Sequence, residues 1–179
     1  MTVALGSLGL VATWPVGAAW PIPFPGDPPV PCTFELHDTA DPGWLMTPSR
    51  GTESATGTMT CTGQLKGAQL RGAPGPFTTH SIYDSAEVAG GNTCALAAGR
   101  GTWDVKLPTA DGGLLDLSGS FTWVGTQVGR MDGDLGRLPV TLGYGAYPDP
   151  GHTGEDCVTK PARHFGTIGQ GTLGYATPV

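Results

Sequence analysis

The amino-acid sequence predicts an all-β protein: a single antiparallel β-barrel of about eight strands, with a two-sheet β-sandwich as the alternative. The chain contains 30 glycines and 17 prolines among its 179 residues, so its apolar segments are short and bounded by turn residues. From Pro21 onward, no window of about a dozen residues has the composition of a long helix. Short sequential strands with one apolar face each favour a barrel, because closure removes exposed sheet edges.

The N-terminal segment is typical of an export signal. Residues 3–19 are apolar and end in Ala18 and Ala19, which suits cleavage after a small residue. We therefore expect residues 1–19 to be a signal peptide, 20–31 a proline-rich linker and 32–179 a single β domain. The first basic residue is Arg50, so the usual positive start is absent, and a retained membrane anchor or a buried strand remain alternatives. Export predicts a secreted, extracellular protein with no stable membrane span after processing.

The cysteines support export. The chain has four of them: Cys32, Cys61, Cys94 and Cys157. They are too far apart for a C-x-x-C metal or redox motif, and an even number in an exported chain predicts two disulfides. Three pairings exist. Cys32 alternates in phase with Phe34, and Cys61 with Met59, so both could face one interior from neighbouring strands. We therefore prefer Cys32–Cys61, with the other two cysteines paired.

The strands follow in sequence order, each bounded by turn residues. Alternation, threonine content and turn signals predict the segments 33–37, 54–65, 77–84, 93–107, 115–123, 126–130, 137–147 and 164–176. The Asp-Gly pair within Pro108–Gly113 lies between two alternating runs and predicts a hairpin. One run places Trp103 and Leu107 on its apolar face, and the returning run places Leu115 and Trp123 on its own.

A phosphate-binding pattern, G-x-G-x-x-G, occurs at Gly169–Gly174. That pattern binds a dinucleotide only where a helix follows it and supplies free N–H groups. Only Tyr175–Val179 follow here, so we expect a terminal β strand and no nucleotide cofactor; no other cofactor is predicted.

The apolar residues of this last strand change phase. Phe165 and Leu173 have one parity and Ile168 the other. An extra residue in a strand shifts the alternation in this way. We therefore expect a β-bulge near Gly166 or Gly169.

Charge limits the partners. The formal net charge is −6 and the sequence pI is about 4.9. The nine basic residues are scattered, whereas a nucleic-acid binder needs clustered Lys and Arg. We expect no nucleic-acid partner.

Five segments together resemble a known group of proteins. They are Cys32, TMTCTG around Cys61, GGNTCALAAGRGTWDVKLPTADGG from Gly90, GEDCVTKP from Gly154, and the closing GTIGQGTLG. In this order they resemble uncharacterised secreted β-rich proteins of high-GC Gram-positive bacteria, across roughly Cys32 to Gly174. The resemblance implies export, a β fold and the four-cysteine frame. It implies no activity and no catalytic residue.

Few residues could carry chemistry. Asp132 and Asp134 have the spacing that begins a calcium loop, but the remaining ligands are missing, and a solvated turn between strands is favoured. His152 lies close to Glu155 and Asp156, which could orient its imidazole, but an exposed loop is favoured. No catalytic residue and no metal site are predicted.

The aromatic residues offer the best ligand contacts. We select Trp44, Trp103, Trp123 and Tyr144 as ligand or rim contacts, because such rings combine apolar area with a polar group. Core packing is favoured for Trp103 and Trp123, which lie on the apolar face of paired strands. Trp44, in a predicted loop, is the candidate for a rim contact or a cap over one barrel end.

The sequence favours a secreted binding or structural module without catalytic activity, with a cell-surface partner. The alternative is an extracellular carrier of a small apolar ligand in the barrel interior, and a secreted enzyme is the least favoured function. A cavity of several hundred Å³ in the barrel would favour the carrier. A filled interior would favour the module, and His and carboxylate side chains that converge in a pocket would favour the enzyme.

Overall fold

The computed structural model describes residues 28–84, 88 and 91–174. The predicted signal peptide and most of the predicted linker lie outside these residues. The strands are β1 (Val30–Trp44), β2 (Gly51–Cys61), β3 (Gln64–Leu65), β4 (Ala68–Gln69), β5 (Gly75–Tyr83), β6 (Ala98–Pro108), β7 (Leu114–Gly125), β8 (Val128–Leu135), β9 (Leu138–Pro148) and β10 (Ala162–Leu173). In the described part of the chain, no helix is long and apolar enough to cross a membrane.

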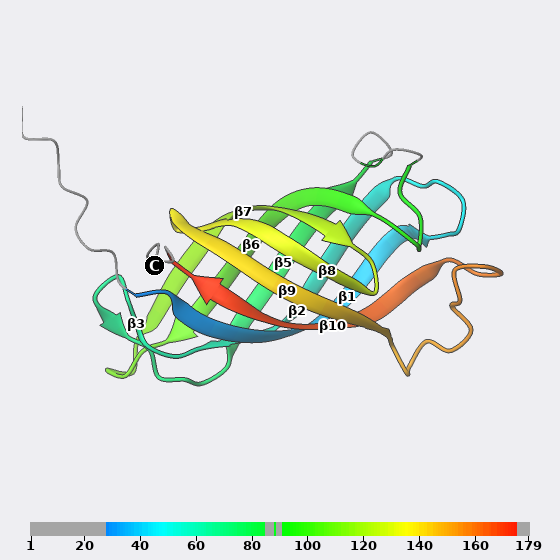
Figure 1. Cartoon of the computed structure of the whole chain (residues 1–179). Coiled ribbons are helices and arrows are strands. Elements are labelled where there is room, and N and C mark those ends of the chain that lie inside the picture. The colour runs from blue at the N-terminus through cyan, green and yellow to red at the C-terminus, as the bar shows by residue number, and fades with distance from the viewer. Residues whose placement is uncertain (1–27, 85–87, 89–90, 175–179) are drawn as a thin grey trace, which may run out of the picture.

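Eight of the strands form a closed antiparallel barrel, as predicted, and the sandwich alternative is wrong (Figure 1). Going around the barrel, the order is β1-β10-β9-β8-β7-β6-β5-β2. Successive strands are neighbours, apart from the small β3–β4 hairpin between β2 and β5. The first and last barrel strands pair with each other, from Val30 opposite Leu173 to Thr39 opposite His164. This pairing leaves the sheet without an open edge.

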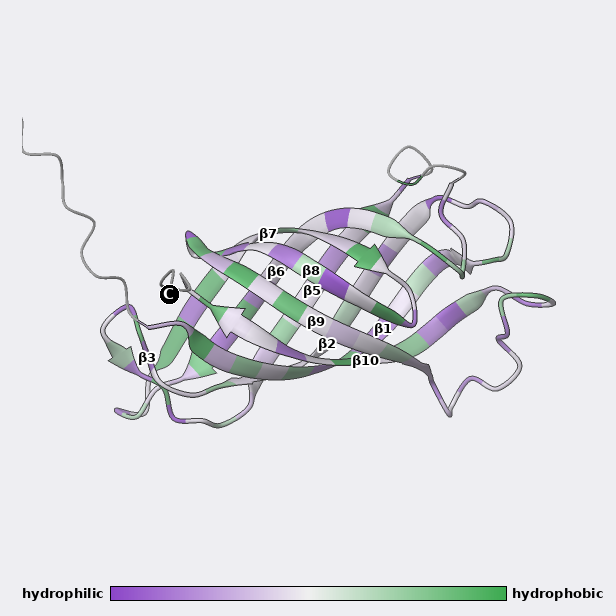
Figure 2. Cartoon of the chain, in the orientation of Figure 1, coloured by the Kyte–Doolittle hydropathy of each residue, from purple (hydrophilic) through white to green (hydrophobic). Residues whose placement is uncertain are grey.

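Strand alternation divides the residues between the interior and the solvent. Along β5 the buried residues include Phe77, Thr79 and Tyr83, whereas His80 and Ile82 between them are exposed. The predicted apolar faces of β6 and β7 also point inward, since their larger apolar side chains are buried or partly buried. Figure 2 shows the alternation as bands of contrasting hydropathy along the strands. The period of two in the sequence therefore becomes the inside and outside of the barrel.

One end of the barrel is closed by the β3–β4 hairpin (Figure 1). Its tight turn is made by Lys66 and Gly67, both with positive φ. The hairpin buries Leu65, and Leu70 just after it is also buried. The Lys66 ammonium donates a hydrogen bond of 2.6 Å to the carbonyl oxygen of Gly136 in the β8–β9 turn. Apolar side chains therefore fill this end of the barrel.

Aromatic rings fill the middle of the interior. Phe34 meets Phe77 edge to face at 5.8 Å between centroids, and Trp103 stacks on Phe121 at 4.7 Å. The Trp103 indole N–H donates to the backbone carbonyl of Asp134. Trp103 thus buries a large apolar surface with its polar atom satisfied, which agrees with its predicted role in the core.

Both disulfides form with the preferred pairing. Cys32 lies directly opposite Cys61 on β1 and β2, with an S–S bond of 2.04 Å. Cys94 bonds Cys157 at 2.08 Å and joins two loops at the other end of the barrel. Two disulfides point to an oxidising, extracellular setting.

The predicted β-bulge in the last strand is wrong. β10 pairs in continuous register with β9 from Phe165 to Leu173, and with β1 over the same residues. Ile168 is simply an outward residue and is half exposed. The apolar residues of this strand change parity only because one of them, Ile168, faces solvent, and single exposed apolar residues are common on protein surfaces.

The Asp132–Asp134 segment lies within β8, where a turn was predicted. The chain reverses later, at Gly136 and Arg137, both of which have positive φ. Two such residues form the type of tight turn that suits twisted antiparallel strands. The hairpin predicted at Pro108–Gly113 is confirmed, since β6 ends at Pro108 and β7 begins just after Gly113.

Candidate functional site

A cavity of about 260 Å³ lies inside the barrel, at the end opposite the β3–β4 hairpin. Inward side chains of several strands form its walls, and loop residues of the β7–β8 and β9–β10 connections form its rim. The larger apolar and aromatic side chains that line it include Leu36, Trp44, Phe121, Trp123, Met131, Tyr144, Tyr147 and Phe165. The barrel is therefore filled at one end and hollow at the other.

Three of the four residues predicted as ligand or rim contacts line this cavity: Trp44, Trp123 and Tyr144. The fourth, Trp103, does not line it and is completely buried in the aromatic core. Trp44 ends β1 and is buried, where a loop position was predicted. Its ring stacks on Tyr83 at 3.9 Å between centroids and meets Trp123 edge to face at 5.6 Å. These contacts fix the Trp44 ring as part of the wall.

Four carboxyl side chains line the cavity: Glu155 and Asp156 belong to the β9–β10 loop at the rim, whereas Asp38 and Glu53 come from the strands β1 and β2. In the β1–β2 register Asp38 lies opposite Ala55, and Ala40 lies opposite Glu53. The two carboxyl-bearing residues therefore occupy diagonal inward positions on neighbouring strands. Asp38 is 5% exposed, and its Oδ2 atom has no hydrogen-bond partner. An unpartnered buried carboxylate oxygen is costly and unusual in a folded protein.

Burial shifts the proton affinity of both carboxyl groups. Desolvation raises the pKa of Asp38 to about 7, although a hydrogen bond with Thr167 and the nearby His37 oppose the shift. Desolvation and the charge of Asp38 together raise the pKa of Glu53 to about 8, against a hydrogen bond from Trp44. Because each charge disfavours the other, the pair retains at least one proton near neutral pH.

Tyr144 faces the same pair from β9. Its pKa is raised above the usual value by burial and then by the charges of Glu53 and Asp38. The phenol therefore stays protonated and can act as a hydrogen-bond donor in the cavity. Three ionisable groups from three strands thus converge on one wall.

The rim carries a histidine cluster. The imidazole of His164 pairs with Glu155 at 2.9 Å, and that of His152 pairs with Asp149 at 3.0 Å. The two histidine rings stack at 3.7 Å between centroids. Glu155 therefore orients His164, whereas the sequence placed it beside His152. His152 lies in the exposed loop that was predicted, but this loop borders the cavity.

The β9–β10 loop is held in place by local bonds. One carboxylate oxygen of Asp156 accepts backbone N–H bonds from Val158, Thr159 and Lys160, at 2.9, 2.7 and 3.1 Å. These bonds lower the pKa of Asp156, and the bond from the Lys160 N–H has the largest effect. The Cys94–Cys157 disulfide then ties this loop to the loop before β6. The rim of the cavity is therefore preorganised.

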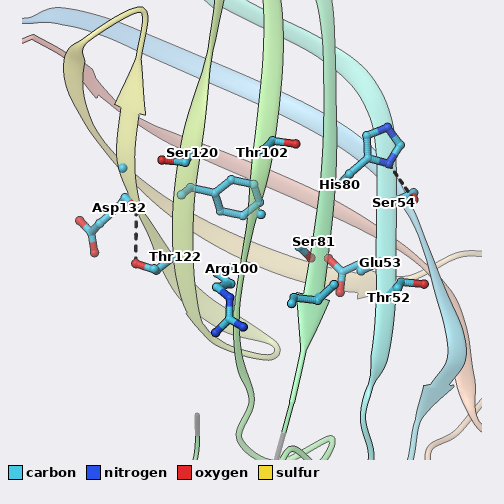
Figure 3. Close-up of a pocket in the computed structure, with 14 residues that line it drawn as sticks. Thr52, Glu53, Ser54, His80, Ser81, Arg100, Thr102, Ser120, Thr122 and Asp132 are labelled. Atoms are coloured by element: carbon cyan, nitrogen blue, oxygen red, sulfur yellow. Dashed lines mark hydrogen bonds between the residues drawn. The ribbon is translucent and has the colours of Figure 1, made fainter. Parts of the chain in front are cut away.

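A larger hollow of about 780 Å³ lies on the outer surface of the sheet, across β2, β5, β6, β7 and β8 (Figure 3). It is open to solvent, and some of its polar side chains already have partners within the protein. Ser54 and His80 are 3.0 Å apart, and the Thr122 hydroxyl donates to the backbone carbonyl of Asp132. A small ligand would remain largely hydrated here. The cavity inside the barrel is more sheltered from solvent and is thus the better candidate for binding a small molecule.

The aspartates considered for calcium lie on the barrel exterior with protein partners. Asp132 pairs with Arg130 at 2.5 Å and accepts a hydrogen bond from Thr141. Asp134 accepts one from Ser120. Within the described residues, no group of three His, Cys, Asp or Glu side chains is placed to hold a metal ion.

Sequence reasoning missed Asp38 and Glu53, although a signal was present. Asp38 continues the inward phase of Phe34 and Leu36, and Glu53 has the phase of Met59. A charged residue at an apolar position of a strand indicates either a bend in the pattern or a buried functional group. Comparison of the chain with protein-family models, curated proteins and solved structures finds no match. The cavity and its residues therefore carry the functional argument.

Proposed function

We propose that this protein is an extracellular carrier that holds a small, largely apolar ligand in the open end of its barrel. The observation that carries the proposal is the cavity of about 260 Å³ with aromatic and aliphatic walls. Concave, mostly apolar pockets with a few polar groups are the usual form of small-molecule sites. This favours the carrier over a purely structural module, for which a filled interior would suffice.

The volume limits the size of the ligand. A cavity of about 150 Å³ can hold a benzene molecule. The larger cavity here accommodates an aromatic ring with a short side chain. Trp44, Trp123 and Phe121 supply flat surfaces against which such a ring can pack.

The extracellular location has a separate basis. We propose that residues 1–19 are removed as a signal peptide and that the barrel acts outside the cell. The two disulfides support this, as do the apolar N-terminal run and the resemblance to secreted proteins of Gram-positive bacteria.

Binding of a neutral probe tests the carrier. Titration of the purified protein with 2-phenylethanol, followed by calorimetry, should give saturable binding at one site. Ala146→Phe adds a ring at a residue that lines the cavity and should weaken this binding by about tenfold or more. Thr58→Phe adds the same ring on the exposed face of β2 and should leave binding unchanged. Absence of binding, or equal binding by both variants, would overturn the proposal.

A secreted enzyme is the second candidate, and the paired carboxyl groups favour it. One of them holds a proton near neutral pH while the other is ionised or close to ionisation, which is how acid–base pairs divide their roles. Ligands that co-purify from the secretion medium can be incubated with the protein and analysed by mass spectrometry. A new product formed by the parent protein but not by Glu53→Gln would identify an enzyme; an unchanged ligand leaves the carrier.

A further inference from the structure

The ionisable side chains that line the cavity are mainly acidic. No residue on its described surface is Lys or Arg, and the histidines at its rim are each paired with a carboxylate. The carboxyl residues that line it are Asp38, Glu53, Glu155 and Asp156. Asp38 is more than nine-tenths buried, and its Oδ2 atom has no hydrogen-bond donor. A buried carboxylate is normally paired with a cation or supplied with several donors. The described protein supplies neither at this oxygen.

The neighbouring rings suit a cation as well. Trp44 donates a hydrogen bond to Glu53, and Trp44 and Trp123 line the same cavity. The faces of Trp and Tyr attract organic cations, and the attraction is greater where water is excluded. The net charge of −6 also favours the approach of a positively charged ligand over that of an anion.

We propose that the ligand carries a protonated amine on an apolar body, with the ammonium group bound between Asp38 and Glu53. This inference rests on the proposed carrier function and names its ligand class. The apolar body packs against Phe121, Met131 and the tryptophan rings, while the ammonium faces the β1–β2 wall. The ammonium donates hydrogen bonds to the carboxylate oxygens, including the one that has no partner in the unliganded protein.

The pH dependence follows from the groups that face the pair. The groups around the pair are Tyr144 and Tyr147 from β9, Thr167 from β10 and Tyr83 from β5, with His37 on the other face of β1 and the His164–Glu155 pair at the rim. At low pH the carboxyl pair is protonated and cannot balance an ammonium. As the pH rises towards 8 the pair loses its protons, while an alkyl amine, with a pKa of about 10, stays charged. Amine affinity should therefore rise from pH 5 to pH 8, and binding near pH 7 should release protons.

Three probes that share a 2-phenylethyl group test the ligand class: 2-phenylethylamine, 2-phenylethanol and 3-phenylpropionate. Calorimetry at pH 7.5 should give the amine an affinity about tenfold or more above that of the alcohol, with the carboxylate weakest. Titration in two buffers of different ionisation enthalpy should reveal proton release for the amine alone. Asp38→Asn and Glu53→Gln should each reduce the preference for the amine to about twofold while the alcohol still binds.

Asp104→Asn is the matched control, because it removes one carboxylate from the exposed face of β6 and should leave the preference intact. Thermal melts establish that each variant is folded. If the alcohol binds but the amine binds no better, or if the preference survives in both cavity variants, the ligand class is wrong and the carrier function stands. If none of the probes binds the parent protein, the carrier function and this inference are both overturned.

Discussion

At the scale of single residues, the barrel contains positions that tolerate little change. Gly171 lies opposite Cys32 on β1 and Leu142 on β9. A Cβ atom added there would overlap the carbonyl oxygen of Thr141 and crowd the Leu142 side chain. Gly171, and likewise Gly169, whose added Cβ would overlap the carbonyl oxygen of Gly143, therefore serve close packing of strands, in agreement with the β-strand interpretation.

Gly171→Val should lower the free energy of unfolding by about 1 to 3 kcal/mol, because backbone atoms of the neighbouring strand must move. Gly143→Val is the control, since its added Cβ would have only one neighbour within 4 Å, the carbonyl oxygen of Gln170 at 3.9 Å. Urea denaturation should find this control close to the parent. Neither protein should bind ATP or NAD. Nucleotide binding that Gly171→Val abolishes without loss of stability would restore the phosphate-binding reading.

Asp38 lowers the stability of the folded protein when it is ionised, because burial disfavours its charged form. Its pKa is raised in the folded state, so the folded protein binds protons more tightly than the unfolded chain. Its contribution to stability is therefore complete below about pH 4 and is lost as the pH rises through about 7.

Asp38→Asn should remove part of the loss of stability that the unliganded protein suffers as the pH rises. At pH 8 it should raise the free energy of unfolding by about 1 to 3 kcal/mol over the parent, since one pKa unit corresponds to about 1.4 kcal/mol. Denaturation at pH 5 and pH 8 measures the difference, with Asp104→Asn as the control. A variant less stable than the parent at pH 8 would contradict the assigned burial cost.

At the scale of elements, the two ends of the barrel differ in structure: one is closed and the other holds the cavity. The β3–β4 hairpin and its leucines close one end, and the Cys32–Cys61 bond staples β1 to β2 within the sheet. At the other end the Cys94–Cys157 bond joins the two loops that border the cavity. One disulfide therefore stabilises the wall, and the other stabilises the rim.

Removal of each disulfide should separate stability from binding. The Cys94→Ala/Cys157→Ala variant opens a loop of 63 residues and should lose up to about 4 kcal/mol of stability. Its affinity for 2-phenylethanol should also fall, because the rim loops lose their tether. Cys32→Ala/Cys61→Ala opens a loop of 29 residues and should be destabilised to a similar degree while its affinity is kept. Equal affinities of the two folded variants for 2-phenylethanol would show that the rim loops do not contribute to ligand binding.

At the scale of the whole molecule, a single sheet closed upon itself makes both the core and the site. Each strand contributes inward side chains along its length, and these side chains fill one end of the barrel and leave space at the other. The cavity therefore needs no second domain or mobile lid within the described residues. The molecule as a whole is acidic, which suits attraction of cations from dilute solution.

Export makes a prediction about the mature chain. Protein collected from the culture supernatant should have lost about twenty N-terminal residues, as expected for signal-peptide cleavage after Ala18 or Ala19. Intact mass spectrometry measures the length, and non-reducing peptide mapping should recover both disulfides with the pairing described above. A full-length protein retained in the cytoplasm with reduced cysteines would contradict export.

The sequence by itself predicted the barrel, most of its inward faces and the hairpin at Pro108–Gly113, and it favoured the cysteine pairing that forms. It predicted the strands with less accurate bounds, since 33–37 became β1, Val30–Trp44. These features depend on local alternation and turn chemistry, which neighbouring residues encode. It misplaced the turn near Asp132, because an Asp-Gly-Asp run fits both a turn and the exposed face of a strand. It also assigned Trp103 and Trp123 alike, although only Trp123 borders the cavity.

Only the tertiary structure decided where the interior is filled and where it is hollow. Asp38 and Glu53 are 15 positions apart in sequence, and Tyr144 is far from both, yet the barrel brings them to one wall. Their proximity depends on strand register and closure, and their pKa shifts depend on burial that no single segment encodes. The site exists because non-local pairing determines which inward side chains meet around the space that they leave.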